Sequence, residues 1–408
     1  MKIEEALEEA RKERLYIIIL AAIQVAHILD FVIMMPLGAT FMRVFDISPV
    51  QFSTLVSAYT ISAGIVGFFG ALYADHFDRK TFLLFNFAGF IGGTFMCAIS
   101  TSFATLLIAR IIAGAFGGVL NACVLSLVSD LIPFQRRGTA MGVVMSAFSM
   151  ASVAGVPAGL WIANAFTWHA AFYFICIIGI IFWIASYIIL PSVKIKIEPK
   201  SFHANLKNFH GIIRQWDYQQ CFLLTSTLAF GIFMIIPFLA PYMVKNIGMK
   251  ESELPYIYLV GGVCTIITAR LVGRLCDRIG SFKVFRVVGF IALLPIFCLT
   301  NLPPTHLWIA LIVTSGFTMF ASARFIPAMT LVSAVVKPSE RGTFMSLENS
   351  ARQLSAGLSS QVGGLIIGST AAGALTNYNI VGYICIGTSL MAIWIAAGIQ
   401  KKISLRPS

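Results

Sequence analysis

Charged side chains are scarce in this sequence of 408 residues. Aspartate, glutamate, lysine and arginine together make up 11% of it, whereas apolar residues make up 58%. A soluble chain of this length would form two or three domains, with about a quarter of its residues charged. The composition therefore excludes a soluble protein and predicts that lipid is the outer solvent.

Three motifs of membrane-associated enzymes and pumps do not occur in the sequence. It has no His-Glu-x-x-His, no Gly-x-x-x-x-Gly-Lys-Ser/Thr and no Gly-x-Ser-x-Gly. An intramembrane metalloprotease, an ATP-driven pump and a lipase need these groups to bind zinc, to hold phosphate or to supply a nucleophile. We therefore expect no enzymatic activity and no cofactor. Active transport would have to draw on an ion gradient.

Paired cysteine spacing is also missing. The 8 cysteines lie in or at the ends of apolar runs, and none forms a Cys-x-x-Cys pair. A structural disulfide or a metal site would need such paired spacing. We interpret the cysteines as small packing residues and expect no bound metal.

Long apolar runs are what the sequence does contain. A helix needs about 20 apolar residues to cross a hydrocarbon layer roughly 30 Å thick. Twelve runs meet this length, which predicts an all-α membrane protein with twelve transmembrane helices in two six-helix halves. The expected spans are 15–39, 51–74, 81–100, 104–130, 138–165, 169–190, 219–243, 254–276, 284–302, 306–336, 342–370 and 380–399.

Lysine and arginine fall almost entirely in alternate connections between these runs. The remaining connections hold only Arg43, Lys245 and Lys250, so the positive-inside rule places both termini and the central loop in the cytoplasm. The net charge of +12 follows from this asymmetry. Nucleic-acid binding is the rival explanation of a basic chain, but no soluble segment carries a basic stripe with interleaved aromatics. A bacterial plasma membrane is the expected location.

The polar segments divide the chain. A mixed-charge stretch precedes the first run, and a second polar stretch separates six runs from six. We expect a cytoplasmic segment 1–14, a six-helix half 15–190, a cytoplasmic linker 191–218, a second half 219–399 and a tail 400–408.

Two charged turns, half a chain apart, share one pattern. The first contains Asp75, Arg79 and Lys80, and the second contains Asp277 and Arg278. A carboxylate beside cations at a helix end can pair across two half-domains in one state and release in another. A plain positively charged loop is the alternative. A second duplicated turn follows the fourth and tenth runs, with Arg137-Gly138-Thr139 and Arg341-Gly342-Thr343.

These turns resemble those of the major facilitator superfamily, nearest to its drug and sugar efflux proton antiporters. The superfamily's first turn reads Gly-x-Leu-Ala-Asp-Arg-x-Gly-Arg-Lys. The chain matches it at Ala74, Asp75, Arg79 and Lys80 and departs from it at Ala71, Tyr73, His76 and Asp78. The resemblance covers essentially the whole chain and implies two parallel halves. It also implies that Asp75 and Arg79 steady the outward-facing state.

Runs four and five resemble two further motifs of these antiporters. Run four carries Arg110, Gly114 and Gly118, similar to Arg-x-x-x-Gly-x-x-x-Gly. Run five carries Gly155, Pro157 and Gly159, similar to the efflux motif that ends Gly-Pro-x-x-Gly, with Val156 inserted before the proline. Small residues at this spacing also permit close helix packing, which explains the glycines equally well.

Run one holds polar side chains at intervals of three. Gln24, His27 and Asp30 lie on one helix face, with Met34 one turn further on. Ionisable groups inside a membrane are costly and mark functional sites. We hypothesise that Asp30 and Arg110 face one cavity, where protonation of Asp30 releases the cation and substrate competes with the proton. Two alternatives remain: Asp30 neutralises Arg110 structurally, or His27 carries the proton.

The second half has its own intramembrane cation. Arg324 lies in run ten, and we assign substrate contact to it together with Gln24, Met34 and Asn121. Glu348 and Arg352 open run eleven four residues apart, so they can pair on one helix face. Whether Arg324 meets substrate or Glu348 stays open at this stage.

The sequence thus predicts a secondary active transporter that works by alternating access. We expect proton-coupled export of a small organic compound, with protons, substrate and the bilayer as partners, no nucleic acid, and a monomeric state. Symport or uniport uptake is the rival within transport. A non-transporting membrane receptor is the rival from another class.

Overall fold

The computed structural model describes residues 2–73, 77–192, 209–337 and 340–405. Its first half is built from helices joined by short turns. Their bounds are α1 (Lys2–Ile33), α2 (Gly38–Val44), α3 (Pro49–Tyr73), α4 (Arg79–Ala98), α5 (Phe103–Leu131), α6 (Phe134–Met145), α7 (Ala147–Met150), the π-helix η2 (Ala151–Gly155), α8 (Val156–Ala165) and α9 (Trp168–Ile189).

The second half repeats this plan and adds a small hairpin. Its elements are α11 (Trp216–Lys245), the 3₁₀-helix η3 (Glu251–Glu253), α12 (Leu254–Ile279), α13 (Ser281–Thr300), α14 (Leu307–Ala323), α15 (Phe325–Val335), α16 (Arg341–Ile366), β1 (Gly368–Ser369), β2 (Leu375–Thr376) and α17 (Tyr378–Leu405). The two strands pair antiparallel.

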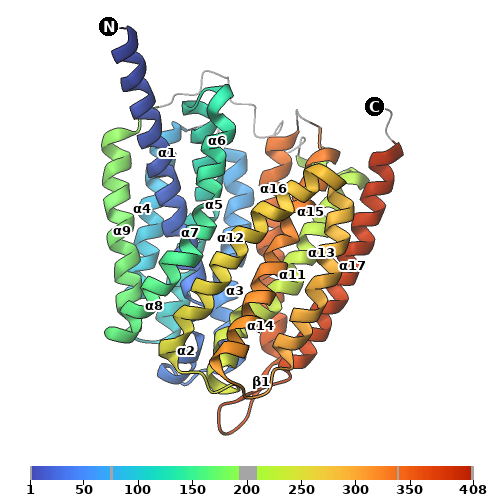
Figure 1. Cartoon of the computed structure of the whole chain (residues 1–408). Coiled ribbons are helices and arrows are strands. Elements are labelled where there is room, and N and C mark those ends of the chain that lie inside the picture. Colours follow the sequence, from blue (N-terminus) through green and yellow to red (C-terminus); the bar gives the residue numbers. More distant parts are fainter. Residues whose placement is uncertain (1, 74–76, 193–208, 338–339, 406–408) are drawn as a thin grey trace.

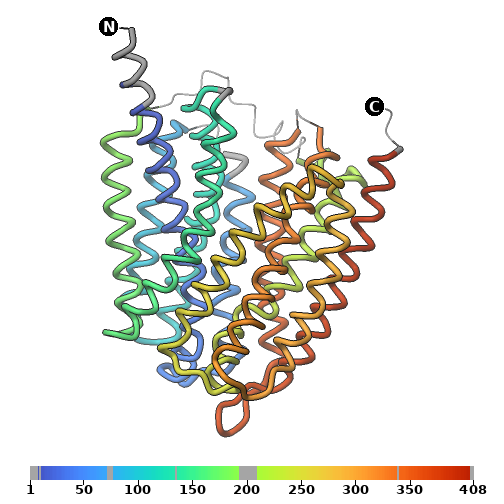
Figure 2. The backbone as a smooth tube through the Cα atoms, viewed as in Figure 1, coloured from blue at the N-terminus to red at the C-terminus, as the bar shows by residue number. Residues whose placement is uncertain are grey.

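The two halves lie side by side along the bundle. Helices α1 to α9 form the blue-to-green group and α11 to α17 the yellow-green-to-red group, and the smooth backbone trace shows the same division (Figures 1 and 2). Helix α1 starts and α17 ends at the same end of the bundle, which we name the termini end. The opposite end carries β1, β2, α2 and η3, and we name it the hairpin end.

Eleven helical stretches of the described residues are long and apolar enough to cross a membrane. The expected span 342–370 falls on α16, which is long enough but does not meet that criterion of apolarity. Helix α16 can be polar because it packs against α3 and α11 instead of lipid. Its Ser355 hydroxyl, for example, donates to the Ser226 carbonyl oxygen at 2.7 Å. The expected count of twelve apolar spans is therefore not confirmed.

Two expected spans are interrupted, each next to a proline. The span 138–165 is divided into α6, α7, η2 and α8, and the backbone N–H of Val156 bonds to the Ala151 carbonyl, five residues back. Pro157 has no N–H and its ring crowds the carbonyl four residues before it, so the widened turn accommodates it. The span 306–336 breaks at Arg324, because Pro327 cannot donate to the carbonyl of Ala323.

The apolar core is shared between the halves at the hairpin end and divided at the termini end. One cluster contains residues of both halves, such as Phe41, Phe52 and Phe238. Two further clusters have their fully buried residues in one half each: one lies around Leu120 in the first half, and the other lies around Leu331 in the second half, with Phe68 of α3 packed against it. The halves are therefore packed together at the hairpin end.

Glycines allow α3 and α5 to pack backbone to backbone inside the first half. A Cβ atom at Gly114 would lie 2.3 Å from the Tyr59 carbonyl oxygen, and one at Gly118 would lie 2.2 Å from that of Ala63. Real Cβ atoms do not approach backbone so closely. Both glycines therefore act here as packing residues.

Substituting Gly118 with alanine is expected to lower stability by about 1–3 kcal/mol, because the methyl group must push α3 and α5 apart. Gly92→Ala is the matched control, since that glycine is exposed and its Cβ would meet nothing within 4 Å. Thermal unfolding of both variants in detergent checks this. Equal midpoints for the two would contradict the close packing.

Candidate functional site

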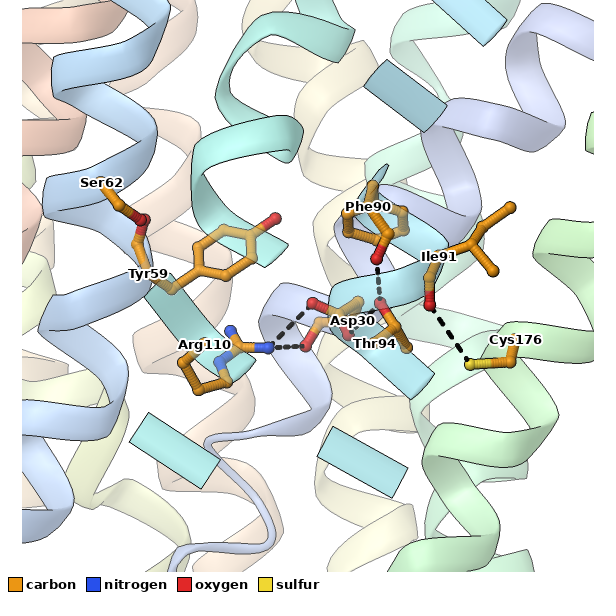
Figure 3. A network of polar contacts seen from close by, with 8 residues as sticks. All are labelled: Asp30, Tyr59, Ser62, Phe90, Ile91, Thr94, Arg110 and Cys176. Atoms are coloured by element: carbon orange, nitrogen blue, oxygen red, sulfur yellow. Dashed lines mark hydrogen bonds and ion pairs between the residues drawn. The ribbon is translucent and has the colours of Figure 1, made fainter. Parts of the chain in front are cut away.

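The centre of the first half holds a buried ion pair between Asp30 of α1 and Arg110 of α5. Arg110 Nη1 lies 2.8 Å from Asp30 Oδ2, and both side chains are 0% exposed. Thr94 Oγ1 of α4 lies 3.0 Å from the other carboxylate oxygen (Figure 3). The carboxylate is thus held by one cation and one hydroxyl.

Arg110 also lies over an aromatic ring. Its guanidinium carbon is 4.3 Å from the ring centroid of Tyr59 on α3. Arg110 Nε and Nη2 and the Tyr59 hydroxyl have no hydrogen-bond partner among the described residues. The guanidinium is therefore positioned by a carboxylate on one side and a π-face on the other.

Tyr59 in turn contacts the boundary between the halves. Its ring stacks on Phe31 of α1, with centroids 5.3 Å apart. Phe31 meets Phe233 of α11, in the second half, with centroids 5.8 Å apart.

Two further polar residues of α1 extend the site toward the termini end. His27 is buried, one helical turn before Asp30, and its ring nitrogens lack hydrogen-bond partners among the described residues. Gln24 Nε2 donates to Asn121 Oδ1 of α5 at 2.9 Å. The structure thus brings together Gln24, His27, Asp30, Arg110 and Asn121.

Met34 does not join this group. It is completely buried in the apolar cluster that both halves share. A substrate contact at Met34 would require that packing to open.

Arg324 occupies a buried position in the second half, between α14 and α15. Its Nη1 donates to the Ser389 hydroxyl of α17 at 2.6 Å. Its Nε has no hydrogen-bond partner in the described part of the chain. Glu348 pairs instead with Arg352, at 3.6 Å, and is itself only 3% exposed. Arg324 and Glu348 are therefore not an ion pair in this structure.

A polar cluster joins the halves at the hairpin end. Arg43 of α2 contacts the Glu251 carboxylate of η3 with both Nη atoms, at 2.5 and 3.2 Å. The hydroxyl of Thr40 donates to the same carboxylate at 3.2 Å. The hydrogen bonds from Arg43 to Glu251 raise the pKa of the guanidinium. Nearby, Gln361 of α16 accepts from Thr54 and Ser57 of α3.

Residues 20–360 match the sequence model of the Major Facilitator Superfamily. The chain belongs to this superfamily. The uncharacterized MFS-type transporter YceJ of Bacillus subtilis (strain 168) is 24% identical over 359 residues, which cover 87% of this chain and 90% of that protein. Multidrug resistance protein 2 of the same organism is 23% identical over 397 residues, covering 94% and 96%.

A solved structure shares the fold. It is a bacterial homolog to the human lysosomal transporter Spinster, in an inward-facing and unoccupied conformation. Its TM-score is 0.75 at 16% identity, and the match covers 97% of this chain and 99% of that one. The resemblance to the superfamily and the all-α membrane fold that the sequence predicts are therefore confirmed. The protein is a multi-pass membrane transporter of the superfamily, whose members are not enzymes.

The charged turns of this superfamily member make contacts within one half. Asp75 lies outside the described residues. Arg79 forms an ion pair with Asp130 at the end of α5, at 3.4 Å, and Lys80 lies over the Tyr187 ring of α9 at 5.6 Å. Asp277 and Arg278 are exposed. The side chain of neither forms a hydrogen bond or ion pair with another described residue.

The motif glycines of α8 and its preceding turn position α1. A Cβ at Gly155 would lie 3.0 Å from Leu29, and one at Gly159 would lie 2.9 Å from Ile33. Pro157 is buried between them. These small residues let the helix that carries Asp30 pack closely against run five.

Sequence reasoning missed the residues that complete the ion pair. Thr94 is one polar side chain in an apolar run, and Tyr59, Phe31 and Phe233 are members of a large aromatic set, 12% of the chain. Thr94 could have been noticed in the sequence because it is a polar residue inside an apolar run. No signal separates these aromatic residues from those that face lipid, because the rotation of each helix is set by its neighbours.

Proposed function

We propose that this transporter exports a small organic compound in exchange for protons, with Asp30 as the proton-carrying group. The observation that carries the proposal is the fully buried pair of Asp30 and Arg110. A buried carboxylate and guanidinium compensate each other's charge. Protonation of Asp30 would leave Arg110 without its counter-ion, so the pair and its surroundings would have to rearrange.

The arrangement of the halves supports alternating access. The shared cluster and the contacts of Arg43 and Gln361 close the hairpin end. At the termini end each half has its own buried cluster, and Phe68 of α3 contacts Phe209 beside the second one. With the termini end cytoplasmic, as the lysine and arginine distribution favours, this is an inward-facing state. In it, substrate would enter from the cytoplasm.

Substrate contacts are proposed for the polar residues that flank the pair. Gln24 and Asn121 offer an amide pair beside His27, and Met34 would become accessible as the shared cluster opens. Arg324 has no carboxylate ion pair among the described residues, which favours an electron-rich group on the substrate at this point. Export is favoured by the similarity to a protein named for multidrug resistance.

The charged turns are proposed as switches that act in the other state. Arg79 and Lys80 start α4, and Asp277 and Arg278 lie in the last turn of α12, all at the termini end. Asp75, outside the described residues, is included in the proposal by its place in the sequence. Closing that end would bring the turns of the two halves together. Glu348 and Arg352 are proposed to act with them, since they lie in the half of α16 that is nearer the same end. The two six-helix halves are proposed to move as units of a monomer.

Everted membrane vesicles test the direction and the coupling. A compound library is first screened for thermal stabilisation of the purified protein, since a ligand of the folded state raises its unfolding temperature. The best ligand is then added to energised vesicles with an acidic lumen. Antiport predicts that it collapses the pH gradient, because protons leave as substrate enters. An unchanged or larger gradient with accumulated substrate contradicts antiport, and binding without flux contradicts transport.

A further inference from the structure

An unbroken series of ring contacts leads from the second half to the buried ion pair. Phe233 contacts Phe31, Phe31 stacks on Tyr59, and Tyr59 supports the Arg110 guanidinium. Arg110 then binds Asp30 at 2.8 Å. Phe233 comes from the second half, and the other four residues come from the first.

Exposure changes along this series in one direction. Phe31 and Phe233 are partly exposed at the boundary between the halves. Tyr59 is 1% exposed, and Arg110 and Asp30 are 0% exposed. The series thus begins where the halves meet and ends at the proton-carrying group of the proposed function.

The position of Tyr59 depends on ring packing. Its hydroxyl has no hydrogen-bond partner among the described residues, so packing against Phe31, Arg110 and the His27 ring defines where the ring lies. The near-parallel stack, with 25° between the ring planes, transmits a displacement of Phe31 to Tyr59. Phe31 also follows Asp30 directly on α1, so a rotation of that helix moves both.

We propose that Phe31 and Tyr59 couple separation of the two halves to the Asp30–Arg110 pair, with Phe233 as the contact from the second half. The proposal rests on the proposed function, because it takes Asp30 as the proton carrier. When the halves separate at the hairpin end, Phe233 leaves Phe31, Tyr59 loses its support, and Arg110 is free to move from the carboxylate. Conversely, protonation of Asp30 releases Arg110, which removes the support of Tyr59 and Phe31 and favours separation of the halves at the hairpin end.

Several titratable groups surround Asp30 and belong in any account of its pH response. They are His27 on the same helix, Tyr59 on α3, Cys97 on α4, Arg110 on α5 and Cys176 on α9. Phe31, Tyr59 and Phe233 act on Arg110 through their positions and do not exchange the proton themselves. They are positioning residues.

The test measures half-domain separation against pH without needing the substrate. Gly138 of α6 and Gly342 of α16 lie near the starts of their helices at the termini end. Both are exposed and have open space around an added Cβ. Both are replaced by cysteine and spin-labelled, and the partly exposed Cys264 and Cys298 are replaced by serine. Label distances are then measured in lipid nanodiscs at acidic and alkaline pH.

The parent protein is expected to change its distance distribution with pH, and Asp30→Asn to abolish the change. Phe31→Leu and Phe233→Leu are expected to reduce the pH-driven population change about fivefold or more, a coupling of ordinary size. Tyr59→Leu should do the same. Tyr59→Phe should keep the pH-driven population change, because the hydroxyl has no hydrogen-bond partner among the described residues. Phe85→Leu, at a site 66% exposed, is the control for losing a ring.

The outcomes separate the two proposals. A pH response that persists in Asp30→Asn overturns the proposed function. A response that is lost in Asp30→Asn but unchanged in Phe31→Leu, Phe233→Leu and Tyr59→Leu overturns the coupling role alone. Unfolding temperatures of all variants identify any that fail to fold, and the remaining two positions then decide.

Discussion

Replacing Asp30 with asparagine is expected to reduce pH-gradient-driven flux per folded protein molecule at least about tenfold. Asparagine keeps the shape of the side chain, and its oxygen can still accept a hydrogen bond from Arg110 or Thr94. It cannot take up or release a proton. Flux of the ligand identified by thermal stabilisation, driven by an imposed pH gradient in proteoliposomes, is the measurement.

Asp46→Asn is the matched control for this change. Asp46 is exposed at the hairpin end and has a φ of +49°, a backbone conformation that asparagine also adopts readily. It should transport like the parent. If Asp30→Asn keeps full proton-driven flux, then Asp30 serves to neutralise Arg110 and has no part in coupling.

Removing Arg110 alone is expected to cost about 3–5 kcal/mol of stability, because it leaves a buried carboxylate without a cation. Arg110→Gln should therefore unfold at a much lower denaturant concentration than the parent. The double variant Asp30→Asn, Arg110→Gln should recover a large part of the loss, since neither charge remains. Chemical unfolding in detergent, followed by circular dichroism, measures the full double-mutant cycle.

Arg43→Gln provides the comparison for an exposed ion pair. Arg43 is 56% exposed in its contact with Glu251, so losing it should cost no more than about 1 kcal/mol. Equal losses for Arg43→Gln and Arg110→Gln would contradict the energetic role of burial. Additive losses in the cycle would show that Asp30 and Arg110 do not stabilise one another.

The fold was largely predictable because lipid imposes one simple rule on it. Each outward-facing helix must be apolar for about 20 residues, so the spans could be counted along the sequence. Helix α16 departs from this rule because neighbouring helices cover it, and a sequence window cannot recognise such a neighbour. The widened turn η2 and the break at Arg324 depend on the local backbone geometry next to a proline. A proline can kink, widen or break a helix, so the sequence alone does not predict which of these occurs.

The candidate site was predictable where electrostatics restricts the choices. An arginine and an aspartate inside apolar runs each need a partner, and the structure brings Asp30 and Arg110 together. The same reasoning left the partner of Arg324 open between substrate and Glu348, and the structure pairs Glu348 with Arg352, as their spacing allowed. The rings of Phe31 and Tyr59 carry no charge that demands a partner, so their part in the site depends on helix rotation and becomes visible only in three dimensions.

Infrared difference spectroscopy of the purified protein between alkaline and acidic pH tests the proton-carrying role of Asp30 most directly. The account predicts a carbonyl band of a protonated carboxyl group that grows as the pH falls, shifts when aspartate is labelled with carbon-13, and disappears in Asp30→Asn. A band that persists unchanged in Asp30→Asn, or the lack of any such band in the parent, would contradict it.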